Sequence, residues 1–159
     1  MKILESLQKE HLIDRFASHR DSKYIVGAIT KWDKCLRVAL ASDEYLRLIL
    51  NSSALNPLPK LGQFPLMQEA ISQFISNADF LAIKHPDRGL SGVVVKNYIE
   101  EFKKGTKLKD CFIRDKDANM REEGWAYIAD GMHRLVAYGV WKNLEIKDNE
   151  LEVYLCTNL

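Results

Sequence analysis

Five consecutive residues in the last third of the chain have the types and the order needed to hold an anion. Asp130, Gly131, Met132, His133 and Arg134 follow the apolar run 125–129 and precede the apolar segment 135–139. This order predicts a strand that leads directly into a helix. A glycine at such a turn lets a ligand approach the backbone, and the first helical turn presents unpaired N–H groups at the positive end of its dipole. Phosphate groups bind at such places.

The charged side chains of this segment suggest how a phosphate would be held. The His133 imidazole supplies a hydrogen-bond donor, and the Arg134 guanidinium supplies a planar fork that binds phosphate through two bonds. Asp130 beside a phosphate is either a Mg²⁺ ligand or a structural cap turned toward the backbone. We expect any catalysis to involve Asp130, His133 and Arg134, and we expect Arg134→Ala to leave the fold intact because the position is on the first turn of a helix.

A purely structural interpretation of the same residues stays open. Asp130 is then the N-cap of the helix, Gly131 a tight-turn glycine, and His133 and Arg134 two exposed polar residues on a surface helix. Spacing alone does not separate the two interpretations.

The segment 129–138 resembles the Gly-x-x-Arg-x-x-Ala signature of the ParB-like and sulfiredoxin-like superfamily. Its Asp-Gly-x-His-Arg form is similar to that of ParB-like free serine kinases and of ParB-type proteins described as nucleases. Residues 93–105 resemble the helix that the family places after its first strand, 107–114 the following strand, and 152–156 the last strand. The resemblance covers residues 80–157, about half of the chain.

The resemblance implies a bound nucleotide, ATP, ADP or CTP, whose phosphates lie against Gly131, Met132, His133 and Arg134, with Mg²⁺ at Asp130. Sulfiredoxins have a cysteine directly before the His-Arg pair, and Met132 stands there instead, which argues against their thiol chemistry. The chromosome-partitioning members continue into a helix-turn-helix region, whereas this chain ends at Leu159, which puts centromere binding in doubt.

Three further residues are weaker candidates for contact with a phosphate. Arg88 and Ser91 lie where the family often places a second phosphate-contacting group, although a surface turn leading to a helix N-cap explains them equally well. Lys96 could reach a phosphate, although a solvated lysine on an amphipathic helix is the commoner case. A catalytic base would come from the acids of the loop 115–124, among which the sequence selects none.

The elements that position these residues are predicted from apolar spacing. Residues 1–77 are expected to form a helical N-terminal extension, with helices over 4–16 and 24–39, a third that begins at Ser42 and ends near 50, and a short one after Pro65. The Pro- and Gly-containing stretch 56–62 interrupts them.

Residues 78–159 are expected to form the ParB/sulfiredoxin-like domain, with an α/β (α+β) fold built on a small mixed sheet. Short apolar runs predict strands at 80–83, 108–113, 125–129 and 151–156. A helix is predicted over 91–104, with Ser91 as its N-cap and Gly105 after its end. The polar stretch 115–124 reads as a hairpin connection.

Composition excludes several other classes of protein. The chain has 23 Lys and Arg against 22 Asp and Glu, so its net charge of +1 opposes binding of nucleic acid by bulk charge. Its polar N-terminus does not fit a signal peptide and no apolar run fits a membrane span, so we expect a cytoplasmic protein with no membrane partner. Cys35, Cys111 and Cys156 are far apart and indicate neither a disulfide framework nor a zinc site; we expect core thiols.

Three functions follow from this sequence. The first is phosphoryl transfer or nucleotide hydrolysis, with the phosphate charge neutralised by Arg134, the helix dipole and Mg²⁺. The second is a non-catalytic module in which a nucleotide changes how the N-terminal helices pair with a second copy or with another protein. The third, nuclease or DNA-binding activity, is opposed by the charge balance.

Overall fold

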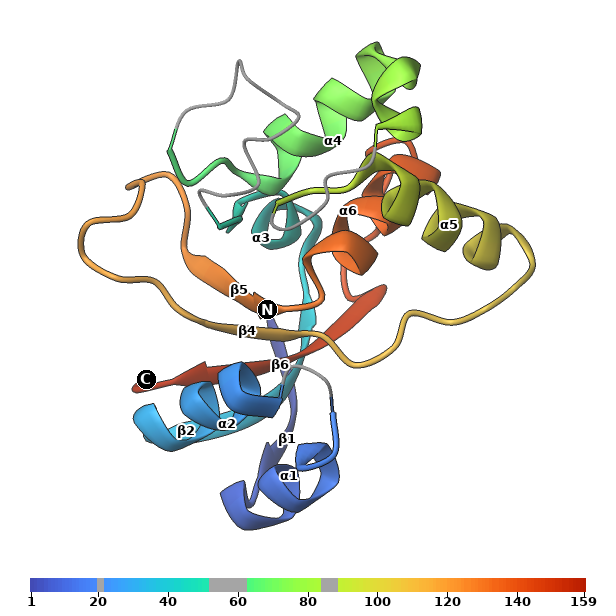
Figure 1. Cartoon of the computed structure of the whole chain (residues 1–159). Coiled ribbons are helices and arrows are strands. Elements are labelled where there is room, and N and C mark those ends of the chain that lie inside the picture. The colour runs from blue at the N-terminus through green and yellow to red at the C-terminus, as the bar shows by residue number, and fades with distance from the viewer. Residues whose placement is uncertain (20–21, 52–62, 84–88) are drawn as a thin grey trace.

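The computed structural model describes residues 1–19, 22–51, 63–83 and 89–159 and shows a mixed α+β protein with one six-stranded sheet (Figure 1). The strands are β1 (Lys2–Leu7), β2 (Lys34–Leu40), β3 (Leu48–Ile49), β4 (Phe112–Asp115), β5 (Ala126–Asp130) and β6 (Leu151–Thr157). The helices are α1 (Lys9–Phe16), α2 (Ser22–Lys31), α3 (Ser42–Leu46), α4 (Met67–Ser76), α5 (Gly92–Lys103) and α6 (Met132–Trp141), with a 3-10 turn η2 at Ala78–Ala82. The strand order is β1-β2-β6-β4-β5-β3.

The predicted purely helical N-terminal extension is wrong, because the first fifty residues contribute three strands to the sheet. The helix expected over 4–16 begins only at Lys9, after β1. The helix expected over 24–39 ends at Lys31, and β2 follows it. The apolar spacing of residues 34–40 fits a helix as well as a strand. These residues form a strand because they pair with β6 along their whole length.

The third predicted helix, from Ser42, is also shorter than expected. α3 ends at Leu46, and the next apolar residues form β3, which pairs in parallel with β5. All residues of β3 are buried, so its short apolar run did not distinguish strand from helix. The segment therefore closes the sheet at the edge opposite β1.

In the second half of the chain one predicted strand is absent and the others are found. Residues 80–83 belong mostly to the turn η2, where a Cβ on Gly92 would overlap the Phe80 carbonyl, so the turn packs directly on the start of α5. The strand expected over 108–113 begins at Phe112 and ends at Asp115. The strands at 126–130 and 151–157, and the helix that begins after Ser91, confirm the prediction.

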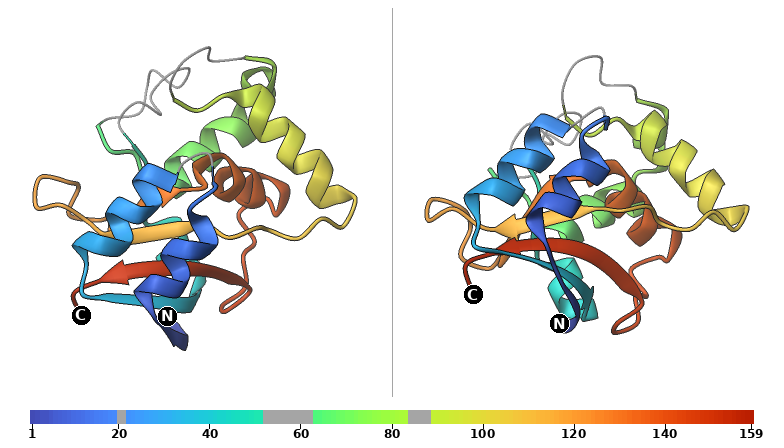
Figure 2. Two further views of the ribbon diagram at one scale, coloured as in Figure 1. Left: turned by 60° about the horizontal axis from the view of Figure 1, so that its bottom comes forward. Right: turned by 90° about the horizontal axis from the view of Figure 1, so that it is seen from below.

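Helices cover both faces of the sheet (Figure 2), and the described residues form one large core on each face. A third, small cluster consists of Ile49, Leu66 and Met120. The side chains of β6 alternate between the two large cores: Val153 and Leu155 belong to the larger core under α3, α4, α5 and α6. Tyr154 and Cys156 belong to the smaller core under α1 and α2. This alternation is the two-residue period of a strand buried on both sides. The apolar stripes of α1 and α2 thus cover the sheet.

A search for membrane spans among the described helices found none that is both long and apolar enough to cross a bilayer.

Two helical glycines are predicted to respond oppositely to alanine. A Cβ on Gly139 in α6 would overlap Ile71 and the Tyr45 hydroxyl, so Gly139→Ala should destabilise the protein by about 1–3 kcal/mol through overpacking. Gly27 in α2 is exposed and has no atom within 4 Å of such a Cβ, so Gly27→Ala should stabilise by about 0.5–1 kcal/mol. Urea unfolding of both variants checks this, and stabilisation by Gly139→Ala would contradict the packing described here.

Candidate functional site

The predicted junction of strand and helix is present at Gly131. β5 ends at Asp130, α6 begins at Met132, and Gly131 alone lies between them as the N-cap with φ of 94°. This left-handed backbone conformation favours glycine. A Cβ at Gly131 would also lie 2.6 Å from the Cys111 sulfur, so glycine is needed for packing as well. The prediction that the strand runs into the helix without a loop is confirmed.

Arg134 lies against the protein rather than in solvent. Its side chain is 13% exposed; Nη2 donates to Asp130 Oδ2 at 2.9 Å, and Nη1 donates to the Asp110 carbonyl at 2.9 Å. The guanidinium thus folds back over the first turn of α6, with Nη2 3.3 Å from the position of a Cβ on Gly131. The guanidinium joins α6 to two other segments, so we now expect Arg134→Ala to cost stability rather than to leave the fold undisturbed.

Asp130 has a role that the sequence interpretation did not include. Its carboxylate is 8% exposed and forms an i,i+4 ion pair with Arg134. Within residues 1–19, 22–51, 63–83 and 89–159, no three His, Cys, Asp or Glu side chains come together as a metal site. A Mg²⁺ ion at Asp130 would therefore need phosphate and water oxygens for much of its coordination shell, which is how Mg²⁺ is commonly held in phosphate sites.

His133 joins the beginnings of α5 and α6. Its Nε2 accepts a hydrogen bond of 2.9 Å from the backbone N–H of Ser91, the N-cap of α5. Burial lowers the pKa of His133, against a smaller opposing effect of the Gly89 backbone. The ring is thus held in the neutral form at pH 7. Two sequence candidates 42 residues apart are in direct contact.

The remaining sequence candidates lie in different surroundings. Ser91 is the predicted N-cap, and its hydroxyl accepts from the Val94 N–H at 3.4 Å. Lys96 is exposed on α5, and Met132 is half-buried against the larger core. Arg88 lies outside the described residues.

The acids of the loop 115–124 are far from the candidate site. In the β4–β5 hairpin Phe112 pairs with Asp130 and Asp115 pairs with Ala126, so the loop leaves the opposite end of the hairpin from Gly131 (Figure 1). Four residues of strand span roughly 13 Å. Asp117 is also paired with Arg114 at 3.1 Å. This loop therefore does not supply a base to the Gly131 turn.

A second arginine, which sequence reasoning missed, lies beside the same site. Arg15 on α1 donates to Asp110 Oδ2 and to the Tyr154 hydroxyl, each at 2.9 Å. Asp110 is thus contacted on its carboxylate by Arg15 and on its carbonyl by Arg134. Arg15 and Asp110 are separated by 95 positions in the sequence, so residue spacing gives no local signal of their contact.

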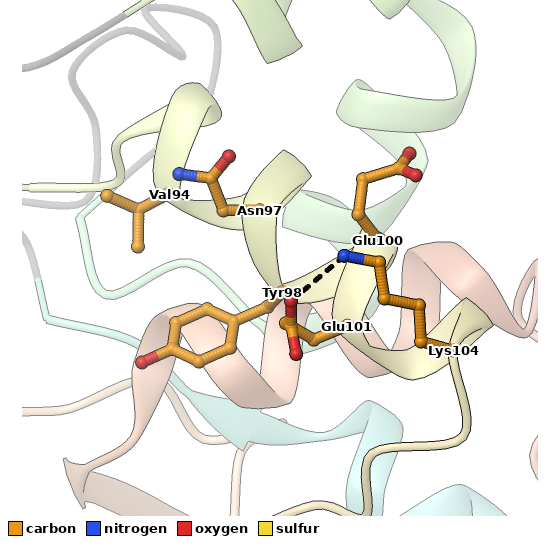
Figure 3. A pocket seen from close by; sticks show the side chains of 6 residues that line it. All are labelled: Val94, Asn97, Tyr98, Glu100, Glu101 and Lys104. Atoms are coloured by element: carbon orange, nitrogen blue, oxygen red, sulfur yellow. Dashed lines mark ion pairs between the residues drawn. The ribbon is translucent and has the colours of Figure 1, made fainter.

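Two surface hollows near α5 do not include the Gly131 turn. One, of about 430 Å³, is lined by Val94, Asn97, Tyr98, Glu100, Glu101 and Lys104 (Figure 3). Lys104 pairs with Glu101 there, and the two glutamates disfavour a phosphate. The other, of about 530 Å³, lies where Phe102 and Trp141 stack, at the C-terminal end of α6.

Comparison with known proteins found no matching family model, no matching curated protein and no matching solved structure.

The loss of Arg134 is predicted to cost stability. Arg134→Ala removes the guanidinium from a carboxylate that is 8% exposed and from the Asp110 carbonyl, so unfolding free energy should fall by about 2–3 kcal/mol. Arg47→Ala is the matched control, because Arg47 forms an i,i+4 pair with Asp43 on the surface and should cost less than about 1 kcal/mol. Equal losses in urea unfolding would show that the Arg134 contacts are no stronger than a surface pair.

His133 is predicted to make stability depend on pH. Because burial lowers its pKa in the folded protein, the unfolded chain binds the proton first as pH falls below about 6.5. The stability that neutral His133 contributes is present above that pH and is lost below it. His133→Gln should therefore lose less stability than the wild type between about pH 7.5 and pH 5.5.

The control for this titration is His11→Gln, which changes an exposed histidine on α1. Thermal unfolding at both pH values should show the wild-type dependence in that variant. An unchanged dependence in His133→Gln would contradict a buried neutral imidazole.

Proposed function

We propose that the chain binds the phosphates of a nucleotide, ATP, ADP or CTP, at the first turn of α6. The observation that carries the proposal is the arrangement of Arg134, whose guanidinium holds an oxyanion, the Asp130 carboxylate, beside the N-terminus of this helix. A guanidinium fork and a helix N-terminus are both common binders of phosphate in proteins. Gly131, as N-cap, has no side chain to cap the first turn.

The first backbone N–H groups of α5 are less suited to binding a phosphate than those of α6. The Val93 N–H donates to the Ile83 carbonyl and the Val94 N–H donates to the Ser91 hydroxyl, so these amides of α5 have protein partners. The phosphate is therefore assigned to the backbone of Gly131, Met132 and His133 and to the Arg134 side chain. Neutral His133 fixes this turn to Ser91 and adds no charge.

Asp130 then controls affinity by competition. A carboxylate next to a phosphate repels it, and both groups are partners for the same guanidinium. Binding requires Arg134 to exchange Asp130 for phosphate, or a Mg²⁺ ion to lie between the two anions. The sign of the effect of neutralising Asp130 distinguishes these two arrangements.

The order α5, β4, β5, α6, β6 supports the proposed membership of the ParB/sulfiredoxin-like superfamily, because it is the helix, strand, strand, helix, strand order implied by the resemblance. The expected first strand is replaced by η2, and β1 and β2 extend the sheet beyond that pattern. The proposal therefore concerns the segment 91–157.

A bound nucleotide could either be turned over by phosphoryl transfer or be bound without turnover. The positions of the acidic residues favour binding without turnover. Asp130 is engaged by Arg134, and the acids of the loop 115–124 lie at the other end of the hairpin. Phosphoryl transfer needs a group that positions or deprotonates the acceptor. In a non-catalytic module the effect of nucleotide would reach α1 through Asp110, which contacts both Arg134 and Arg15.

Calorimetric titration with ATP, ADP and CTP, with and without Mg²⁺, tests the proposal. We expect Arg134→Lys to bind about tenfold more weakly than wild type, because an ammonium replaces a bidentate fork. We expect Asp130→Asn to bind several-fold to about tenfold more tightly, because the competing charge is removed. If Asp130→Asn instead binds nucleotide more weakly than wild type, and does so only when Mg²⁺ is present, Asp130 is a metal ligand.

The control is Asp43→Asn, the same substitution in an i,i+4 Asp–Arg pair on α3. It should leave affinity unchanged. No binding of any of the three nucleotides by wild type and by Asp130→Asn, with melting temperatures showing both folded, would refute the proposed site. Release of labelled phosphate from bound ATP would decide for turnover.

A further inference from the structure

Two cysteines that are far apart in the sequence face each other across the sheet. Cys35 on β2 pairs directly with Cys156 on β6, and their sulfurs lie 3.6 Å apart. Both side chains point into the smaller core under α1 and α2, with exposures of 1% and 0%. Both are free thiols, as expected of core cysteines. Their spacing in the sequence carries no sign of this contact.

The direct pairing of Cys35 with Cys156 is compatible with a disulfide. Directly opposed residues of antiparallel strands have Cα atoms about 4.5–5.5 Å apart, within the roughly 4.4–6.8 Å that a disulfide spans. The sulfurs must approach from 3.6 Å to about 2.05 Å, which needs adjustment of the side chains rather than of the strands.

We propose that Cys35 and Cys156 are a redox-active dithiol, which a small peroxide oxidises to a disulfide between β2 and β6. This inference is independent of the proposed nucleotide site. It adds a modification site on the opposite face of the sheet from the larger core.

The two thiols have distinct roles in the reaction. The two sulfurs are in hydrogen-bond contact, in which either thiol can donate. This contact lowers the pKa of Cys35, against an opposing effect of burial and together with a smaller effect of the Lys9 charge, whereas the contact and burial raise the pKa of Cys156. The reaction is written with Cys35 as the attacking thiolate, because its pKa is the one that the contact lowers; exchanging the two cysteines gives the same disulfide. Its sulfur attacks one oxygen of hydrogen peroxide, the O–O bond breaks, and the departing hydroxide takes a proton to form water, leaving a sulfenic acid.

The second step closes the disulfide. The Cys156 sulfur attacks the Cys35 sulfenic sulfur, the S–O bond breaks, and the hydroxide leaves as water with the Cys156 proton. Two thiols are oxidised to one disulfide and one peroxide is reduced to two waters. The buried thiols are accessible to an oxidant as small as hydrogen peroxide, whereas larger reagents can reach them only when α1 and α2 separate from the sheet.

The disulfide would join segments 121 residues apart and so restrict the unfolded chain strongly. For a chain of this length we expect the melting temperature to rise by about 10 °C on oxidation.

Cys111 provides the internal control. It is fully buried on the other face of the sheet, in the larger core, where its thiol donates to the Lys109 carbonyl. Burial raises its pKa to about 12, so it is a poor nucleophile. It should stay reduced while the other two thiols are oxidised.

The test is to treat the folded full-length chain with hydrogen peroxide, block remaining thiols with an alkylating reagent after denaturation, and digest with trypsin. We expect free thiols to fall from three to one. Residues 35–37 should be recovered linked to 148–159, while the peptide 110–114 carries alkylated Cys111. Cys111→Ala should give the same linked peptide, and Cys156→Ser should give none and no rise in melting temperature.

The proposal is overturned if the wild type keeps three alkylated thiols, or if Cys111 forms disulfides as readily as Cys35. It is also overturned if the only products are sulfinic acids or disulfides between two chains. Peptide mapping of the wild type decides these outcomes even if a variant fails to fold.

Discussion

The antiparallel pairing of β2 with β6 is the interaction on which the rest of the structure depends. It runs without a register shift from Lys34 opposite Thr157 to Leu40 opposite Leu151. β6 also pairs in parallel with β4, so it is the strand through which β1 and β2 join the C-terminal hairpin. Because β6 is largely buried on both faces, successive residues from Val153 to Cys156 point alternately into the two cores. A slip of one residue would exchange Val153 and Leu155 with Tyr154 and Cys156.

The candidate site is connected to this pairing through the residues just before β4. Asp110 lies just before β4, next to Cys111, whose carbonyl accepts from the Tyr154 N–H at 2.9 Å. From there Asp110 meets Arg134 through its carbonyl and Arg15 through its carboxylate. Charges on α1, on the β4 entry and on α6 are thus mutually compensated. In the function proposed above, an incoming phosphate would compete with these pairs, so we expect such a site to favour anions that exceed a single carboxylate in charge and number of acceptors.

The two faces of the sheet therefore carry different chemistry. The turn at Gly131 is polar, half-buried and made of residues that compensate each other's charge. The Cys35–Cys156 pair is apolar in its surroundings, fully buried and defined by strand register alone. Arg15 and Tyr154 link these regions, because Tyr154 packs in the same small core as the two cysteines and its hydroxyl accepts from Arg15.

The sequence by itself determined the local features that depend on neighbouring residues. The strand before Gly131, the helix after it and the Ser91 N-cap follow from short-range rules of period, backbone conformation and capping. Only the tertiary structure decided that 2–7 and 34–40 are strands, because apolar spacing suits either element and the partner strands lie far along the chain. It also decided the partners of Arg134, the contact of His133 with Ser91 and that of Cys35 with Cys156. These pairs are created by the folded sheet, since side chains separated by tens of residues have no fixed distance until strand register sets one.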